Sequence, residues 1–352
     1  SESGKLSLAD LNITQHNFSK SLEILAGIIS DDTENNDEII TRLRTIISSD
    51  KSNADAYKML VDLLIKKGDH ERAVISMNKL AEFSPESSDF IIECSERLNA
   101  ADYSSNDLDL LKAKVYGKTG RYSQAAAILS NIYSRDKAAG FDVEEIANSI
   151  LEHEPENAEA LSILCSILID RSQLDKAKTL CTYISSLEGS RFKEMAENFY
   201  SILMEKFPDD VELMLKYSTI LLEMDKIIDA KALILKAING NPDLFYEIVP
   251  NFYEPASRSK EIASGILNIL NAMDRSRTDI FLYDFIKAEI LYLAGNADES
   301  MKMVNDLLDR HPDKEGQILG IIERMKENNP ESENMSEFEF KYYLSKKNYD
   351  KA

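Results

Sequence analysis

The chain has 352 residues, of which 43% are hydrophobic and 29% charged, and its formal net charge is −21. This acidic balance, without a Lys/Arg cluster, argues against binding through nucleic-acid phosphates or an anionic membrane surface. No run of about 18 apolar residues predicts a membrane span. Three irregularly spaced cysteines form neither a disulfide framework nor a metal pattern, so we expect a cytoplasmic or other reducing compartment.

A small residue recurs at nearly even steps, and the successive differences in position are 52, 52, 52, 53, 70 and 52. A fixed period of this kind indicates a repeat architecture, in which each unit buries its apolar face against its neighbours. The recurring residues are Ser21, Ala73, Ala125, Ala177, Ala230, Ser300 and Ala352.

Residues 53–86 show how one unit is expected to fold. Apolar side chains recur at helical spacing from Tyr57 to Leu64, and Gly68 supplies a left-handed exit from that helix. A second apolar face follows from Ala73, and Pro85 ends it because proline cannot continue the helical hydrogen bonds. The pattern predicts two antiparallel helices that approach closely at Ala73.

These positions resemble the tetratricopeptide repeat family. Degenerate matches in the same register occur in 2–34, 106–137, 158–189, 211–242 and 281–312. The resemblance implies an all-α, right-handed helical-repeat solenoid that binds other proteins. In the second unit the matching residues are Tyr57, Leu60, Leu64, Gly68, Ala73, Met77 and Pro85.

The repeat departs from that family in its length, because its usual period is about 34 residues. The residues by which each 52-residue step exceeds that usual period include apolar positions at helical spacing. We therefore predict three helices per 52-residue unit. A third helix could fill or reshape the groove that first helices line in the family. The expected third helices span 36–49, 88–99, 142–153, 190–206, 260–273 and 315–328.

One step is longer than the rest, and its excess is the proline-rich segment 241–260, which contains the aromatic pairs Phe245-Tyr246 and Phe252-Tyr253. These four aromatic residues are candidates for binding a partner, since exposed aromatic side chains often anchor interfaces. The alternative is that they fold back as a plug between neighbouring units. The sequence leaves both open.

The chain is therefore expected to hold four units and the start of a fifth in 1–240, the insertion 241–260 and further helices in 261–330. Residues 331–352 are expected to form a truncated further repeat, because the sequence stops where a second helix should begin. An open end of this kind would favour self-association, since terminal repeats normally carry a polar cap.

The first helices supply a second set of partner-binding candidates at equivalent groove positions. They lack the Lys/Asn pattern with which some family members clamp a terminal carboxylate, and they favour an amphipathic helix or an extended apolar peptide. The alternative is that they contact the third helix as core. The candidates are Leu110, Lys114, Leu215, Thr219, Phe285 and Glu289.

No combination of residues predicts catalysis, a metal site or a cofactor: there is no glycine-rich phosphate loop, and the four histidines lie in or beside predicted turns. We expect a non-enzymatic scaffold for an apolar or basic polypeptide, with the acidic charge serving either solubility or steering. The alternatives are a structural subunit of a large assembly, or an accessory region of an enzyme whose catalytic domain lies outside these residues.

Overall fold

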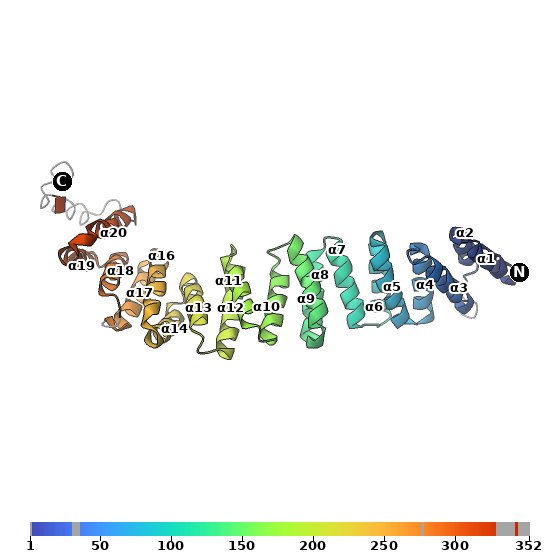
Figure 1. Ribbon diagram of the computed structural model, residues 1–352, viewed down its shortest axis with the longest axis horizontal. Helices are drawn as coiled ribbons and strands as arrows, with labels where there is room; N and C mark the ends of the chain where they lie inside the picture. The colour runs from blue at the N-terminus through green and yellow to red at the C-terminus, as the bar shows by residue number, and fades with distance from the viewer. Residues whose placement is uncertain (1, 30–35, 276–277, 329–341, 344–352) are drawn as a thin grey trace. The chain divides into compact units, whose positions relative to one another are not determined.

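The computed structural model describes residues 2–29, 36–275, 278–328 and 342–343 (Figure 1). Within these ranges the regular elements are all helices, which confirms the predicted all-α helical-repeat fold. The chain divides into two compact units, Ser1–Ser172 and Gln173–Ala352. The predicted truncated repeat at 331–352 lies outside the described residues, apart from Tyr342 and Tyr343, and so does the end through which self-association was expected.

In the first unit each helix packs against the helices before and after it in the chain, as expected of a repeat stack. The helices are α1 (Glu2–Thr14), α2 (Phe18–Ala26), α3 (Asn36–Ser49), α4 (Ala54–Lys67), α5 (His70–Phe83), α6 (Ser88–Ala100), α7 (Asn106–Lys118), α8 (Tyr122–Arg135), α9 (Gly140–His153) and α10 (Ala158–Asp170).

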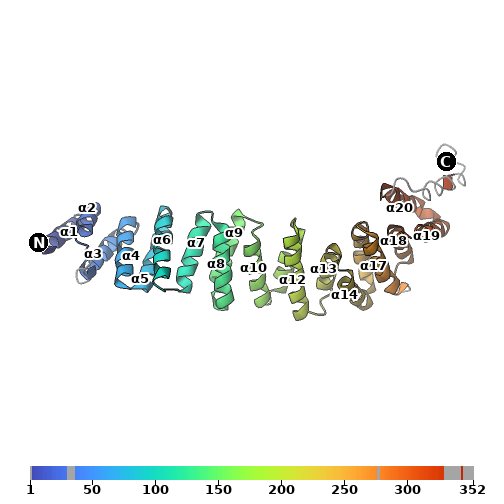
Figure 2. The ribbon, with the colours of Figure 1, turned by 180° about the vertical axis from the view of Figure 1, so that it is seen from behind.

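The second unit continues the same kind of packing, and α17 lies beside α14 and α18 (Figure 2). Helices occupy all the segments that were expected to hold a third helix, namely α3, α6, α9, α12, α17 and α20. The helices of this unit are α11 (Leu174–Ser186), α12 (Ser190–Lys206), α13 (Val211–Glu223), α14 (Ile227–Gly240), α15 (Phe245–Ile248), α16 (Tyr253–Ala256), α17 (Lys260–Ala272), α18 (Ile280–Leu293), α19 (Ala297–Arg310) and α20 (Glu315–Asn328).

The recurring small residues lie inside the helix hairpins. From Ser21 to Ser300 all six are fully buried, while Ala352 lies outside the described residues. Where the residue is serine, its hydroxyl donates to a carbonyl of the facing helix: Ser21 to Ala9 O at 3.2 Å and Ser300 to Ala288 O at 2.6 Å. The hydroxyl is therefore satisfied inside the hairpin, which explains why serine can replace alanine here.

Short polar caps set where the first helix of a hairpin begins. The Asn53 side chain accepts a hydrogen bond from the backbone N–H of Ala56 at 3.1 Å, and Ser105 does the same for Leu108 at 3.2 Å. Such caps satisfy backbone donors that the helix itself leaves unpaired. Asn157, Asp210 and Asp279 cap α10, α13 and α18 in the same way.

The turn after each of these first helices contains a residue with positive φ. Glycine adopts this left-handed backbone at little cost, whereas other residues pay about 1–2 kcal/mol. A Cβ added at Gly68 would meet no atom within 4 Å, so the backbone alone constrains that position. The residues with positive φ in these turns and in the turn after α1 are His16, Gly68, Gly120, Ser172, Asp225 and Gly295, and two further residues with positive φ, Asp102 and Gly189, follow α6 and α11.

The insertion after α14 folds inward. Phe245 and Phe252 are fully buried in the core that α14, α17 and α18 share, and the Phe245 ring stacks on Tyr283 with centroids 6.3 Å apart. Of the two alternatives for this segment, the two phenylalanines therefore form the inward plug, because packing there removes most of their apolar surface from water. Their predicted role as surface anchors is wrong. Tyr246, by contrast, is 53% exposed.

The left-handed turn can be tested by comparing two glycines. Gly68→Ala should destabilise the first unit by about 1 kcal/mol, because alanine is strained at φ 77°. Gly117→Ala should stabilise it by about 0.5–1 kcal/mol, because Gly117 lies inside α7 with open space around its Cα. Urea unfolding followed by circular dichroism measures both, and shifts of the same sign would contradict this account of the turn.

A second comparison tests the inward plug. Phe252→Ala should destabilise the second unit by about 3–5 kcal/mol, since it leaves a cavity in a closed core. Tyr246→Ala should cost less than about 1 kcal/mol, because that side chain is half exposed. Equal losses in thermal unfolding would mean that the Phe252 ring is not packed as described.

Candidate protein-interaction site

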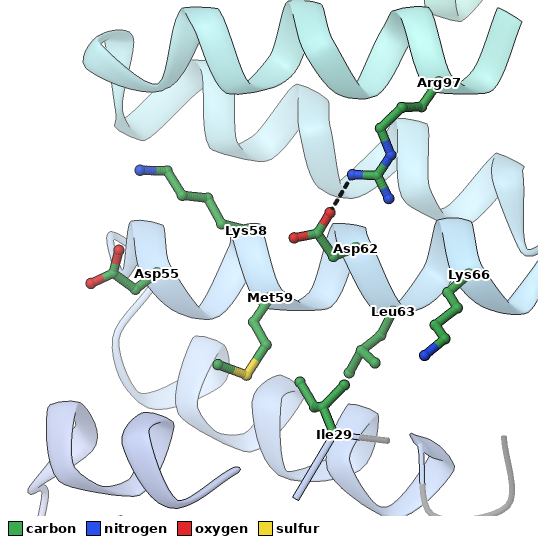
Figure 3. Close-up of a pocket in the computed structure, with 8 residues that line it drawn as sticks. All are labelled: Ile29, Asp55, Lys58, Met59, Asp62, Leu63, Lys66 and Arg97. Carbon is green, nitrogen blue, oxygen red and sulfur yellow. Dashed lines mark hydrogen bonds and ion pairs between the residues drawn. The ribbon is translucent and has the colours of Figure 1, made fainter. Parts of the chain in front are cut away.

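A hollow of about 610 Å³ opens over α4 in the first unit (Figure 3). Its apolar part consists of Ile29, Met59 and Leu63, and its rim is charged. In the view of Figure 3 these three side chains lie below the axis of α4, and Lys58, Asp62 and Arg97 lie above it. The rim residues are Asp55, Lys58, Asp62, Lys66 and Arg97.

Helical spacing places the α4 residues of the hollow on one face. Asp55, Met59, Asp62 and Lys66 follow one another at three- and four-residue steps, so their side chains project in similar directions. Tyr57, on the opposite face of the helix, is buried. The same amphipathic pattern that packs α4 into the core therefore presents a continuous outer surface.

An ion pair joins α4 to α6 at the edge of this hollow. Arg97 Nη1 donates to Asp62 Oδ1 at 2.6 Å, and this hydrogen bond raises the pKa of Arg97. Below it, burial raises the pKa of Cys94 to about 12, so the thiol stays protonated at neutral pH and is a poor nucleophile. The site thus holds charge and apolar surface but no activated nucleophile at this position.

The ion pair between a first and a third helix recurs along the chain. Asp10 on α1 accepts two hydrogen bonds from Arg42 on α3, at 2.8 and 3.0 Å. Glu289 on α18 accepts from Arg324 Nε on α20 at 2.6 Å. In each case a basic side chain of the third helix therefore pairs with an acidic side chain of the first helix. One of these acidic residues, Glu289, was predicted to line an open groove.

Pairing with the third helix buries Glu289 almost completely, and the residue is only 2% exposed. Burial raises the pKa of Glu289, and the Arg324 guanidinium partly opposes that rise. Its predicted role as a partner-binding residue is wrong, since α20 covers the carboxylate. Sequence reasoning included this outcome as the alternative that such residues contact the third helix.

The other predicted groove residues remain accessible to different degrees. Lys114 on α7 is exposed and Leu110 is half-buried. On α13, Leu215 and Thr219 are half-buried, and the Thr219 hydroxyl donates to Leu215 O at 3.0 Å. Their role in binding stays a prediction.

The structure brings three predicted residues together around Arg324. Its guanidinium lies 5.8 Å from the centre of the Phe285 ring and 5.9 Å from that of Tyr253, in addition to its bonds with Glu289. Phe285 and Tyr253 are half-buried. The exposed Tyr246 lies apart in the insertion, where its hydroxyl donates to Asp279 Oδ2 at 3.4 Å.

Sequence reasoning missed a feature of the turns and a feature of the hollow. The positive-φ residues in the turns after the first helices fall at the same steps as the small residues, and a search for Gly alone could not show this because three of the six are His16, Ser172 and Asp225. In the α4 hollow, Lys58 and Asp62 lie at groove positions that the repeat makes equivalent to Leu110 and Lys114, and the sequence indicated that equivalence. The apolar centre of Ile29, Met59 and Leu63 was not foreseen.

The described residues contain no cluster of histidine, cysteine or acidic side chains arranged to hold a metal ion. Across the helices that the structure describes, none is both long and apolar enough to cross a membrane.

Comparison with known proteins finds only distant similarity: no family model and no curated protein matches the chain. Similar solved structures include Naa15/Naa10 bound to HypK-THB, with 11% identity, coverage of 99% of this chain and 67% of that chain, and a TM-score of 0.24. A human IFIT1 dimer with m7Gppp-AAAA has 10% identity and a TM-score of 0.21, and the match covers 82% of this chain and 70% of that chain. The P58(IPK) TPR domain has 12% identity and a TM-score of 0.20, and the match covers 94% of this chain and 99% of that chain. At these TM-scores the similarity carries no argument about fold or function.

The buried Glu289 predicts a pH dependence. Because its folded pKa is raised, its contribution to stability is complete below its ordinary value of 4.5 and is lost as the pH rises through the folded value. The unfolding free energy of the wild type, relative to Glu289→Gln, should therefore fall as the pH rises above 4.5.

Glu212→Gln is the control, because hydrogen bonds from Lys178 and Lys216 lower the pKa of Glu212. The unfolding free energy of the wild type, relative to this variant, should rise as the pH rises through the lowered folded pKa toward 4.5. This change has the opposite sign to that expected for Glu289. Urea unfolding at a series of pH values measures both differences. A Glu289 difference that is flat or rises with pH would contradict the burial of that carboxylate.

Proposed function

We propose that this chain is a non-enzymatic scaffold that binds a polypeptide partner on its outward helix faces. The observation that carries the proposal is the α4 hollow, where the half-buried Ile29 and Met59 lie inside a ring of charged side chains. Interfaces commonly have this arrangement of an apolar centre and a polar rim.

The proposed mechanism divides the work between the two parts of the hollow. An apolar side chain of the partner would lie against Met59 and Ile29, and most of the affinity would come from its burial. Lys58 and Lys66 would pair with acidic groups and Asp55 with basic ones, which orients the partner more than it tightens binding. The Asn53 cap and the Gly68 turn hold α4 in place at its two ends.

We further propose that the unit is a three-helix form of the tetratricopeptide repeat. Supporting this, α4, α7, α10 and α13 begin at residues 54, 106, 158 and 211, with two helices between each pair. The added third helix packs against the first helix of its own unit, as α6 does against α4.

The experiment compares partners captured by wild-type protein and by Met59→Glu from extracts of the source cells, with chemical cross-linking and mass spectrometry. A glutamate at position 59 should remove the partner that cross-links to α4, because a hydrated carboxylate would replace the apolar centre of the contact and would lose its water on binding. Ile228→Glu is the matched control, since Ile228 is 87% exposed on α14 in the second unit.

Circular dichroism establishes that each variant keeps its helices. If Met59→Glu retains the same partners as the wild type, or if no polypeptide cross-links to the α4 face, the proposed function is wrong. Equal losses in Met59→Glu and Ile228→Glu would also contradict it, because the effect would then not belong to the hollow.

A further inference from the structure

A second hollow, of about 570 Å³, opens in the first unit between α3, α4 and α5. Its floor includes Tyr57 and Leu60 of α4, which are buried. Neither residue lines the first hollow, and helical spacing puts them on nearly the opposite side of α4 from Met59 and Asp62. The two hollows are therefore separate surfaces.

The rim of this second hollow is basic in a chain with a net charge of −21. Arg44 and Lys51 contribute from α3 and the turn after it, and Arg72 and Lys79 contribute from α5. Among the described residues that line the hollow, none is acidic, whereas Asp55 and Asp62 line the first one. Local charge here is opposite to the charge of the whole chain.

The hollow also contains large apolar side chains that face solvent. Ile75 is 56% exposed and Phe83 is 44% exposed, both on α5. They are eight residues apart, which is about 12 Å along a helix and leaves them on the same face. Apolar anchors at this spacing match the side chains that a partner helix shows on one face over two turns.

The ion pairs already present do not block this rim. Arg72 pairs with Asp69 at 3.1 Å and Lys79 pairs with Glu82 at 3.0 Å, and all but Asp69 are half or more exposed. Exposed ion pairs between residues three or four apart contribute little to stability, so carboxylates of a partner can replace them at little cost.

We propose that the hollow between α3, α4 and α5 binds an acidic amphipathic segment of another protein. Apolar side chains of that segment lie against Ile75 and Phe83, while its carboxylates pair with Arg44, Lys51, Arg72 and Lys79. The exposed apolar pair favours a polypeptide over a nucleic acid, which would use the cations but leave Ile75 and Phe83 without a use. This partner chemistry differs from the basic polypeptide that the overall charge suggests.

The test measures fluorescence anisotropy of a labelled helical peptide with the full chain. The probe carries Leu and Phe on one face and Glu on the other, and a second peptide has Lys in place of every Glu. We expect the acidic peptide to bind, the basic peptide not to bind, and the affinity of the acidic peptide to fall as salt is added. A single-stranded oligonucleotide and anionic vesicles are measured alongside.

Charge reversal locates the binding. Arg72→Glu with Lys79→Glu should weaken the acidic peptide at least tenfold, and Ile75→Ser should weaken it severalfold. Lys5→Glu with Lys20→Glu is the matched control, because it changes the net charge equally at two exposed positions of α1 and α2 that line neither hollow, and it should leave affinity within about twofold. Circular dichroism checks the fold of each variant.

Several results would overturn this proposal: no acidic-peptide binding below about 1 mM, equal binding of the basic peptide, or equal loss in the two charge-reversed variants. Tighter binding of the oligonucleotide or vesicles, insensitive to Ile75→Ser, would assign the cations to a nucleic acid or a membrane instead. None of these results bears on the α4 hollow, so this inference and the proposed function fail independently.

Discussion

The contact between paired helices at a small, fully buried residue is the constraint on which the rest of the fold depends. At Ser21 and Ser300 the hydroxyl reaches a carbonyl of the facing helix, and Ala73 occupies the corresponding position between α4 and α5. A larger side chain would separate the two helices and open the core around them. Because each unit is stabilised by its neighbours, an error at one contact would weaken the adjoining ones.

The third helix gives this repeat a different outer surface from one built of hairpins alone. Its arginines bond to acidic groups on the first helix, as Arg42 does with Asp10 and Arg324 with Glu289. At Glu289 the cover is complete, and the carboxylate lies in the core with a raised pKa. At Asp62 the corresponding pair with Arg97 remains half exposed and forms part of a hollow. An acidic residue paired with an arginine 35 residues later is thus a core contact at Glu289 and part of the surface at Asp62.

Local charge, not the total, decides what each surface can bind. The chain is strongly acidic, yet of the two hollows beside α4 one is lined by mixed charges and the other has a basic rim. Fields fall off within about 8–10 Å in physiological salt, so a partner near Arg72 and Lys79 responds mainly to those cations. The net charge still affects the long approach of a partner and the solubility of the chain.

The amino-acid sequence by itself determined the helices and their hairpin pairing. These features arise from contacts within a few tens of residues, such as the apolar spacing of α4 and the small Ala73, and such local patterns can be seen directly in a sequence. Tertiary packing decided which side chains of the insertion face water. The pairs Phe245-Tyr246 and Phe252-Tyr253 look alike in sequence, yet the phenylalanines are core and Tyr246 is exposed.

The same limit applies to the sites. The carboxylate of Glu289 is covered by Arg324, 35 residues further along the chain, and its position in a first helix fitted both an open groove and a contact with the third helix. The basic hollow gathers Arg44, Lys51, Arg72 and Lys79 from two helices and a turn, although no two of them adjoin in the sequence. Burial and local charge depend on which segments pack side by side, and the period of a repeat fixes the helices without fixing what their neighbours cover.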